Sequence, residues 1–405
     1  MTHPLHEHRD PVVQDSHAPT GARSRAMHAL SARAAQGRFV LQSCTVCAAV
    51  AWPPRDACPQ CWGELAWADQ PVGACVVNQT TIHVSTDPYF RAHLPWRMGT
   101  VQLDAGPVAM AHLYGALKPG MRAVMRLMLD RGGNAALYAL PAEGMSDMND
   151  LQSDAQWREF IIPVAGRTVL VSDAAQATGR AMVRALIQAG AGLVVAGLSA
   201  PASATDADDA ILGHETVRIV RLDLTDAASV AAALGMMERP LDIVINTARH
   251  VRGGGVSRDA ALAKQQFAME VSAMGLSRLA GAAAPLLAGR PQGAFVDLIS
   301  VQALAGDAGF AGFAAAEAAR LSLVQSLRHE MRATGVRVLT VFTGPTDDAD
   351  HQSLPPPKVA PARLAAAVVD ALAQGREQTC VGDVAKDAMA RWLVDPALFI
   401  REINL

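Results

Sequence analysis

The chain has 405 residues, which favours two or three domains over one. Hydrophobic residues make up 51% of the sequence and charged residues 18%, so large cores can be buried and a chain disordered throughout is excluded. The 35 Lys and Arg residues against 38 Asp and Glu give a net charge of -3, which lacks the basic surplus typical of nucleic-acid-binding proteins, and the apolar runs are too short for a membrane-spanning helix.

Residues 1–25 are polar and carry four scattered histidines without a helical or strand period. We expect them to form a flexible tail rather than a metal site. The opening residues lack the apolar stretch of a secretory signal, and clustered thiols are typical of a reducing compartment, so we expect a cytoplasmic protein.

A first domain is predicted over residues 26–142. It begins with a short amphipathic helix within Arg25–Gly37, where Met27, Leu30 and Ala34 fall on one side. Short strands separated by turn signals follow, and their spacing indicates a small β-barrel. The predicted strands are Cys75–Val84, Thr100–Leu103, Val108–Tyr114, Val124–Leu129 and Ala136–Leu140.

Four of the six cysteines form one cluster, Cys44, Cys47, Cys58 and Cys61. Two residues separate the members of each pair, so both thiolates of a turn can face one point, and two such turns supply four sulfurs for tetrahedral zinc. Four protein ligands leave no open position, so we expect structural zinc. The alternative is a reduced or disulfide-linked knuckle without metal.

The segments Gly37–Cys44, Trp52–Arg55 and Cys58–Cys61 resemble the zinc-ribbon and OB-fold family that accompanies thiolases, and Val101–Pro107 and Lys118–Met121 resemble its barrel turns. The resemblance covers about residues 25–142. It implies an accessory module without catalytic residues that docks on a thiolase-like enzyme, an acyl-CoA hydratase or an aldolase. Nucleic-acid binding is the rival use of such a barrel, but its aromatic side chains are sparse and not interleaved with basic residues.

Residues 143–162 are expected to be a linker, and residues 163–405 alternate between strands and helices. That alternation predicts an α/β domain with a Rossmann-like, doubly wound parallel sheet. The predicted strands are Thr168–Ser172, Leu193–Gly197, Val217–Leu222, Ile243–Asn246, Ala294–Ile299 and Val336–Phe342. The predicted helices include Thr178–Gly190, Ala273–Leu287 and Phe313–Ala333.

The order of these segments resembles the short-chain dehydrogenase/reductase family over roughly residues 166–405. Gly166–Ser172 looks like its first strand, and Leu241–Ala248 looks like its Asn-Asn-Ala-Gly segment. The resemblance implies a dinucleotide-binding fold and, in an intact member, NAD(P)-linked redox chemistry.

The cofactor-binding positions of that family are degenerate here. Its turn Thr-Gly-x-x-x-Gly-x-Gly lets the backbone approach a pyrophosphate, but the matching stretch Ser172–Gly179 keeps only Gly179. Asp173 adds a carboxylate where the anion would lie and can cap the helix itself. Gly179, Asp223 and Asn246 are what remains of the cofactor-binding positions, and we do not expect NAD(P) to bind.

The catalytic positions are altered as well. The family uses a tyrosine, a lysine four residues later, a serine and an asparagine. Ser300 matches the serine, but Phe313 stands for the tyrosine, Glu317 for the lysine and Ser272 for the asparagine. Phenylalanine has no proton to give, and a glutamate raises the pKa of a neighbouring acid. No catalytic residue is therefore expected in this domain.

Two interpretations of this half follow. It is a pseudoenzyme kept for its surface, or a divergent oxidoreductase with new catalytic groups among Glu317, His250 and Asp347. A charge on a helix surface or in a loop explains each of these three residues equally well.

The interpretation of this half as a pseudoenzyme kept for its surface rests on apolar segments. Ala273–Leu287 and Phe313–Leu327 are apolar on more than one side, and the resemblance implies that such helices join subunits into a homo- or hetero-oligomer; alternatively they pack on the sheet. The apolar stretch Trp392–Ile400 is a docking segment or folds onto its own domain.

The sequence as a whole predicts a non-catalytic scaffold subunit of an acyl-CoA-processing complex, with no nucleic-acid or membrane partner. The first alternative is a divergent NAD(P)-dependent reductase of a 3-oxoacyl or hydroxyacyl thioester. The second is a zinc-dependent nucleic-acid-binding module, which the charge balance disfavours.

Overall fold

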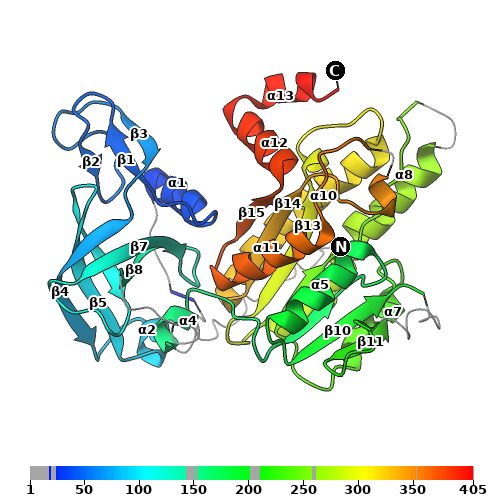
Figure 1. The fold of residues 1–405 in the computed structure, drawn as a ribbon, viewed down its shortest axis with the longest axis horizontal. Helices are drawn as coiled ribbons and strands as arrows, with labels where there is room; N and C mark the ends of the chain where they lie inside the picture. Colours follow the sequence, from blue (N-terminus) through cyan, green and yellow to red (C-terminus); the bar gives the residue numbers. More distant parts are fainter. Residues whose placement is uncertain are drawn as a thin grey trace, which may run out of the picture.

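The computed structural model describes residues 18–19, 24–142, 151, 154–200, 210–257, 261–352 and 354–404. They form a three-stranded sheet, a closed five-stranded barrel and a seven-stranded parallel sheet covered by helices (Figure 1). This architecture confirms the predicted fold class. Most of the predicted tail lies outside the described residues. Among the helices that are described, none is both long and apolar enough to cross a membrane.

The first domain begins with helix α1 (Arg25–Ala34), as predicted, and buries Leu30 and Ala34 against the barrel. The antiparallel sheet that follows has the order β2-β1-β3. Its strands are β1 (Val40–Cys44), β2 (Val50–Ala51) and β3 (Leu65–Asp69). They are short because the two cysteine-containing turns, rather than long strand pairing, organise this region.

The five barrel strands lie where the sequence predicts them. They close in the order β4-β5-β6-β8-β7, with β6 and β8 parallel. The strands are β4 (Gly73–Ile82), β5 (Trp96–Leu103), β6 (Val108–Leu113), β7 (Arg122–Leu129) and β8 (Ala135–Pro141). β5 begins before the predicted Thr100, because Trp96 is buried and pairs with Ile82 on β4. The short helix α2 (Pro88–Ala92) connects β4 to β5.

The second domain is built on a parallel sheet with the strand order β11-β10-β9-β12-β13-β14-β15. Its strands are β9 (Thr168–Val171), β10 (Leu193–Leu198), β11 (Val217–Arg221), β12 (Ile243–Asn246), β13 (Ala294–Ser300), β14 (Arg337–Thr343) and β15 (Gln378–Val381). The order reverses between β9 and β12, and the carboxyl edge at such a reversal is where doubly wound sheets bind ligands.

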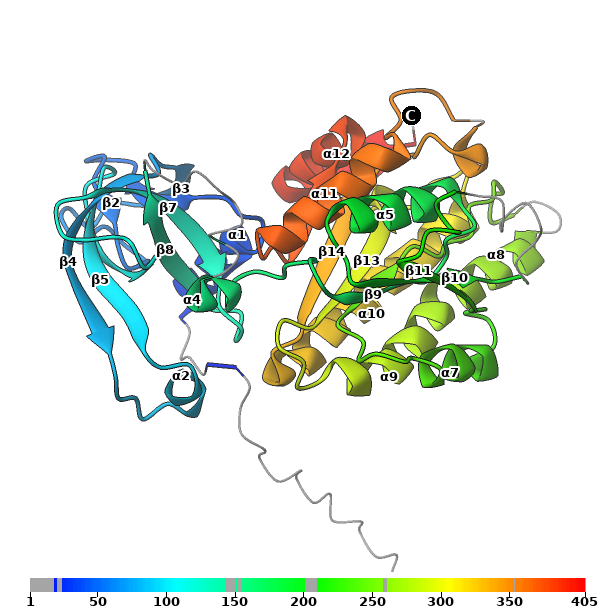
Figure 2. The same cartoon turned by 60° about the horizontal axis from the view of Figure 1, so that its bottom comes forward.

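Helices cover both faces of this sheet. Figure 2 shows α5 and α11 on one face and α7, α9 and α10 on the other. Their bounds are α5 (Ala177–Gln188), α7 (Ala227–Gly235), α8 (Ala261–Met269), α9 (Gly275–Leu287), α10 (Ala311–Met331) and α11 (Pro361–Ala373). A π-helical segment, Glu270–Met274, joins α8 to α9.

The apolar end of the chain folds onto its own domain, which was one of the two predicted outcomes. It forms α12 (Asp383–Val394) and α13 (Pro396–Glu402). Phe399 is buried in the core, and Asn404 accepts a hydrogen bond from the Ala308 amide at 2.8 Å. Several apolar side chains of these two helices nevertheless stay exposed.

The described part of the expected linker is packed structure. Helix α4 (Ala155–Arg158) lies there, and Trp157 and Phe160 join an aromatic cluster with Trp96 and Tyr138 of the barrel. Hydrogen bonds between the halves add to this contact, including Arg337 Nη2 to the Leu129 carbonyl at 3.1 Å and the Glu377 amide to the Ala35 carbonyl at 2.9 Å. The two halves therefore share a buried interface.

Candidate functional site

The four clustered cysteines meet at one point in the ribbon. Their sulfur atoms all lie within 4.8 Å of one another, with Cys44 and Cys61 at 3.4 Å and Cys47 and Cys58 at 3.6 Å. Four Zn–S bonds of about 2.3 Å in a tetrahedron place the sulfurs roughly 3.8 Å apart, so the geometry fits zinc. Four protein sulfurs would leave a bound zinc ion no open position, so the site fits structural rather than catalytic zinc.

Backbone amides favour the thiolate form at this centre. Hydrogen bonds from the amides of Cys47 and Val46 lower the pKa of Cys44 to about 6. The Gln60 amide does the same for Cys58, whose pKa is lowered. Amides that point at thiolates are the usual second shell of such a knuckle.

The second candidate site lies at the carboxyl edge of the parallel sheet. The loop after β9 carries Asp173, whose carboxylate accepts hydrogen bonds from the amides of Ala175 and Gln176. Burial raises the pKa of Asp173. Helix α5 begins at Ala177, and its N-cap residue Gln176 makes no capping hydrogen bond with its side chain. The Asp173 carboxylate therefore stabilises the loop before the helix and is not the N-cap of α5. Amides that a diphosphate would need are thus already paired with this chain's own carboxylate.

The retained Gly179 has a packing role. A Cβ at this position would lie 1.8 Å from the Asp173 carbonyl oxygen, so only glycine lets α5 approach the loop. The Asp223 carboxylate accepts from the amide and hydroxyl of Thr225 at 2.9 and 2.7 Å, in a local turn. Both residues are therefore explained without a nucleotide.

Asn246 belongs to a buried polar network under the sheet edge. It accepts a hydrogen bond from the Ser172 hydroxyl at 2.7 Å and donates to Asp297 at 2.9 Å. Arg320 from α10 completes the network with two hydrogen bonds to the Asp297 carboxylate, at 2.8 and 2.5 Å. The Arg320 Nη1 also donates to the Ala248 carbonyl at 2.8 Å.

The positions that correspond to catalytic groups are buried. Phe313 lies on α10 and is 1% exposed, and the hollow that it lines holds about 10 Å³, room for roughly one water molecule. Ser300 ends β13, and its hydroxyl accepts from the Gln302 amide at 3.2 Å. Ser272 lies in the π-helical segment, and its hydroxyl has no hydrogen-bond partner among the described residues.

Glu317 is a buried residue, so the explanation of Glu317 as a charge on a helix surface was wrong. The α10 turn that carries it faces the end of β13, so its side chain is fully buried and accepts from the Ser300 amide at 2.7 Å. Its other oxygen lies 3.6 Å from Arg320 Nη1 and has no hydrogen-bond partner in the described part of the chain. Burial raises the pKa of Glu317.

Sequence reasoning missed Arg249, which stands where the related segment Asn-Asn-Ala-Gly ends in glycine. Its buried guanidinium donates from Nη2 to Thr346 Oγ1 at 2.7 Å and lies 3.5 Å from Asp348 Oδ2. It therefore spans from the loop after β12 to the loop after β14, across the end of β13. An arginine at a position that favours glycine is the signal that could have identified it.

The other two suggested catalytic groups stand apart from Glu317. His250 contacts the Phe267 ring at 4.6 Å between centroids, and Asp347 is exposed. Within the described residues, no hydrogen bond or ion pair joins either of them to Glu317. The residues present fit a dinucleotide poorly at this edge, because Asp173 pairs with the loop amides and the side chains of Arg249, Glu317 and Phe313 are buried among the chain's own residues.

Comparisons with known proteins find matches to the zinc ribbon and to the dehydrogenase-like domain. The family model described as the ChsH2 rubredoxin-like zinc ribbon domain matches residues 31–66, and the short chain dehydrogenase model matches residues 167–356. An uncharacterised oxidoreductase of Myxococcus xanthus is 28% identical over 44% of this chain and 71% of its own length. Oxidoreductase UcpA of Escherichia coli is 29% identical over 45% and 70%.

Solved structures match the second half. A short chain dehydrogenase from Burkholderia cenocepacia in complex with NADP is 26% identical, with a TM-score of 0.56, over 60% of this chain and 99% of that one. A short-chain dehydrogenase from Streptomyces avermitilis, 22% identical with a TM-score of 0.52 over 59% and 96%, shares the fold. The chain therefore joins a rubredoxin-like zinc ribbon domain of the ChsH2 type to a domain of the short-chain dehydrogenase family.

Proposed function

We propose that this chain is a non-catalytic accessory subunit of an acyl-CoA-processing complex and that its dehydrogenase domain serves assembly. The observation that carries the proposal is the buried group of charges at the sheet edge. Arg249, Glu317 and Arg320 lie within the domain where an active reductase needs a phenol, an ammonium and a nicotinamide. Losing the acid–base group alone lowers a rate by about 10²–10⁴-fold.

Exposed apolar side chains support a docking role for the ribbon. Trp62 is 84% exposed and Val46 is 74% exposed, and both lie beside the cysteine turns. Large aromatic side chains at the centre of an interface often supply most of its binding free energy. The resemblance to thiolase-associated modules makes an enzyme of the thiolase, hydratase or aldolase type the expected partner.

The helices α9 and α10 are the expected contact between dehydrogenase domains. Met274 is exposed at the end of the π-helical segment just before α9, Leu286 is exposed on α9, and Ala315 and Ala318 are exposed on α10. Small residues let a second helix approach closely, so this face suits a second copy or an active reductase. Holding two acyl-CoA enzymes on one scaffold raises the effective concentration of their shared intermediate.

Purification of the native full-length chain tests this proposal. We expect an acyl-CoA enzyme to co-elute in a fixed ratio and that complex to turn over an acyl-CoA. Trp62→Ala should reduce co-elution at least about tenfold, whereas Met236→Ala, which removes a 59% exposed side chain from the dehydrogenase half, should not. Elution of the chain alone in every preparation would contradict the proposal.

The second candidate is a divergent NAD(P)-dependent oxidoreductase. It is favoured by the relatives named oxidoreductase and by the Burkholderia cenocepacia structure with NADP. Ser300 also stands at the end of β13 as in that family. Steady oxidation of NADPH by the isolated chain with a 3-oxoacyl-CoA would favour this candidate over the scaffold.

A further inference from the structure

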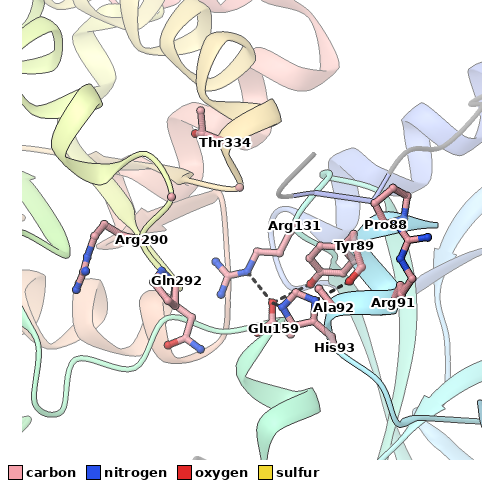
Figure 3. A pocket seen from close by; sticks show the side chains of 13 residues that line it. Pro88, Tyr89, Arg91, Ala92, His93, Arg131, Glu159, Arg290, Gln292 and Thr334 are labelled. Carbon is pink, nitrogen blue, oxygen red and sulfur yellow. Dashed lines mark hydrogen bonds and ion pairs between the residues drawn. The ribbon is translucent and has the colours of Figure 1, made fainter. Parts of the chain in front are cut away.

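A cavity of about 460 Å³ lies between the barrel and the dehydrogenase domain (Figure 3). Helix α2 and Arg131 form its barrel side, and the loops at residues 289–292 and 334–335 form the other side. Figure 3 shows the Arg131 guanidinium between Glu159 and the loop that carries Gln292. A cavity of this volume is in the range that binds small molecules.

Arg131 is a buried charge with incomplete pairing. Its side chain is 4% exposed, and its ion pair with Glu159 is long, with Oε2 3.6 Å from Nε. Nη2 donates to the Arg158 carbonyl at 3.2 Å, but Nη1 is buried without a hydrogen-bond partner among the described residues. A buried guanidinium with an unused donor is destabilising unless an oxyanion reaches it.

Glu159 cannot compensate Arg131 alone, because other donors share its carboxylate. The Tyr89 hydroxyl donates to Glu159 Oε2 at 2.8 Å, and His93 Nε2 lies 3.6 Å from the same oxygen. The Tyr89–Glu159 contact uses the oxygen that faces Arg131. The positive charge at this end of the cavity is therefore only partly neutralised.

On the side of the dehydrogenase domain, two arginines likewise share one carboxylate. Arg290 donates to Asp242 at 2.8 Å, and Arg167 lies 3.5 Å from the same carboxylate oxygen. Three arginines line the cavity, Arg91, Arg131 and Arg290, against the single lining carboxylate of Glu159. The lining residues thus carry an excess of two positive charges.

We propose that this cavity binds the phosphate group of a small phosphate ester. A phosphate dianion matches the excess of two positive charges, and planar guanidinium groups donate paired hydrogen bonds to its oxygens. Arg131 lines the cavity, and a turn of its guanidinium would present the unused Nη1 donor to this contact. The volume exceeds that of inorganic phosphate, and Pro88, Ala92 and Pro291 line the space for the organic part. The inference is independent of the proposed scaffold function, since neither the ribbon surface nor the sheet edge lines this cavity.

Thermal unfolding and calorimetric titration of the full chain test the site. Inorganic phosphate should raise Tm above the value in chloride at equal ionic strength and bind with a Kd of about 0.1–1 mM. Glycerol 3-phosphate should bind at least as tightly as inorganic phosphate, which identifies an ester as the ligand, whereas succinate should bind at least about tenfold more weakly. Arg131→Gln should weaken phosphate binding at least about tenfold, and Arg131→Lys should restore part of it.

Two further variants keep the test decisive if Arg131→Gln does not fold. Arg91→Gln changes an exposed side chain on the rim and should weaken phosphate binding severalfold without changing Tm in chloride. Arg218→Gln removes an exposed arginine far from the cavity and should leave phosphate binding unchanged. Equal Tm values in phosphate and chloride, tighter binding of succinate than of phosphate, or unchanged phosphate binding in both Arg91→Gln and any folded Arg131 variant would overturn the proposal.

Discussion

Arg249 donates a hydrogen bond from Nη2 to Thr346 Oγ1 at 2.7 Å, although 97 residues separate the two along the chain. This contact ties the loop after β12 to the loop after β14 over the carboxyl edge of the sheet. In a doubly wound fold that edge is normally open to a ligand. Here the chain's own side chains hold it together, so their removal should destabilise the domain.

The Arg320–Asp297 pair should be the most costly ion pair to break. Both side chains are fully buried, so Arg320→Met leaves an uncompensated carboxylate and should lower the free energy of unfolding by about 3–5 kcal/mol. Arg218→Met breaks an exposed pair with Glu238 and should cost less than about 1 kcal/mol. Urea denaturation measures both values, and equal stability of the two variants would refute a structural role for the network.

Gly179 should tolerate no side chain, because α5 approaches the loop after β9 closely at this position. The Cβ of Gly179→Ala would meet the Asp173 carbonyl at 1.8 Å, so we expect a loss of about 2 kcal/mol or more. Gly235 ends α7 with nothing within 4 Å of an added Cβ, so Gly235→Ala should be neutral or stabilising by up to about 1 kcal/mol. Thermal unfolding compares the two; a neutral Gly179→Ala would show that the loop can move away.

The zinc site and the strands were predictable because their signals are local. The spacing of Cys44, Cys47, Cys58 and Cys61 specifies two turns whose sulfurs converge, whatever the rest of the chain does. The alternation of short apolar runs with helical periods likewise predicted a doubly wound parallel sheet. Among the strands in the described part of the chain, β15 and the three ribbon strands were missed, because they are short or lie beside the cysteine turns.

Removal of one cysteine should release the metal. Cys58→Ser replaces one of the four converging sulfurs, so we expect zinc content to fall from about one per chain to nearly none and the ribbon to unfold locally. Cys75→Ser changes a cysteine outside the cluster and should keep its zinc. Metal analysis and limited proteolysis report both effects. A Cys58→Ser protein that melts like the parent would contradict structural zinc.

Asp348 should make the free energy of unfolding depend on pH in acidic solution. Although burial alone would raise it, hydrogen bonds from His351 and Thr346 lower the pKa of Asp348 to about 2, below the roughly 3.9 of an unfolded aspartate. Because the pKa of Asp348 is lower in the folded protein than in the unfolded chain, its carboxylate stabilises the fold above about pH 4. This contribution is lost as the pH falls through about 2. Asp348→Asn should therefore cost about 1 kcal/mol at pH 7, after allowance for solvent screening, and nothing near pH 2. Urea denaturation of the parent and of Asp348→Asn between about pH 2 and 7 measures this dependence. A difference in unfolding free energy that stays constant with pH would show that Asp348 does not titrate in this way.

The charges at the sheet edge could not be predicted, because their partners come from distant segments. Glu317 has the sequence context of an exposed helical residue, and only the packing of α10 against the end of β13 buries it. Arg249 needs Thr346, and Asn246 needs Ser172, 74 residues earlier. The loss of the phenol and the ammonium is visible in the sequence, but what replaces them is a property of the folded chain.

Fluorescence titration of the full-length protein with NADH and NADPH tests the central claim most directly. With Asp173 paired to the loop amides and Arg249 filling the edge of the sheet, we predict no saturable binding up to about 1 mM of either nucleotide. Binding of NADH or NADPH with a micromolar Kd would contradict the account and make the domain a working dehydrogenase.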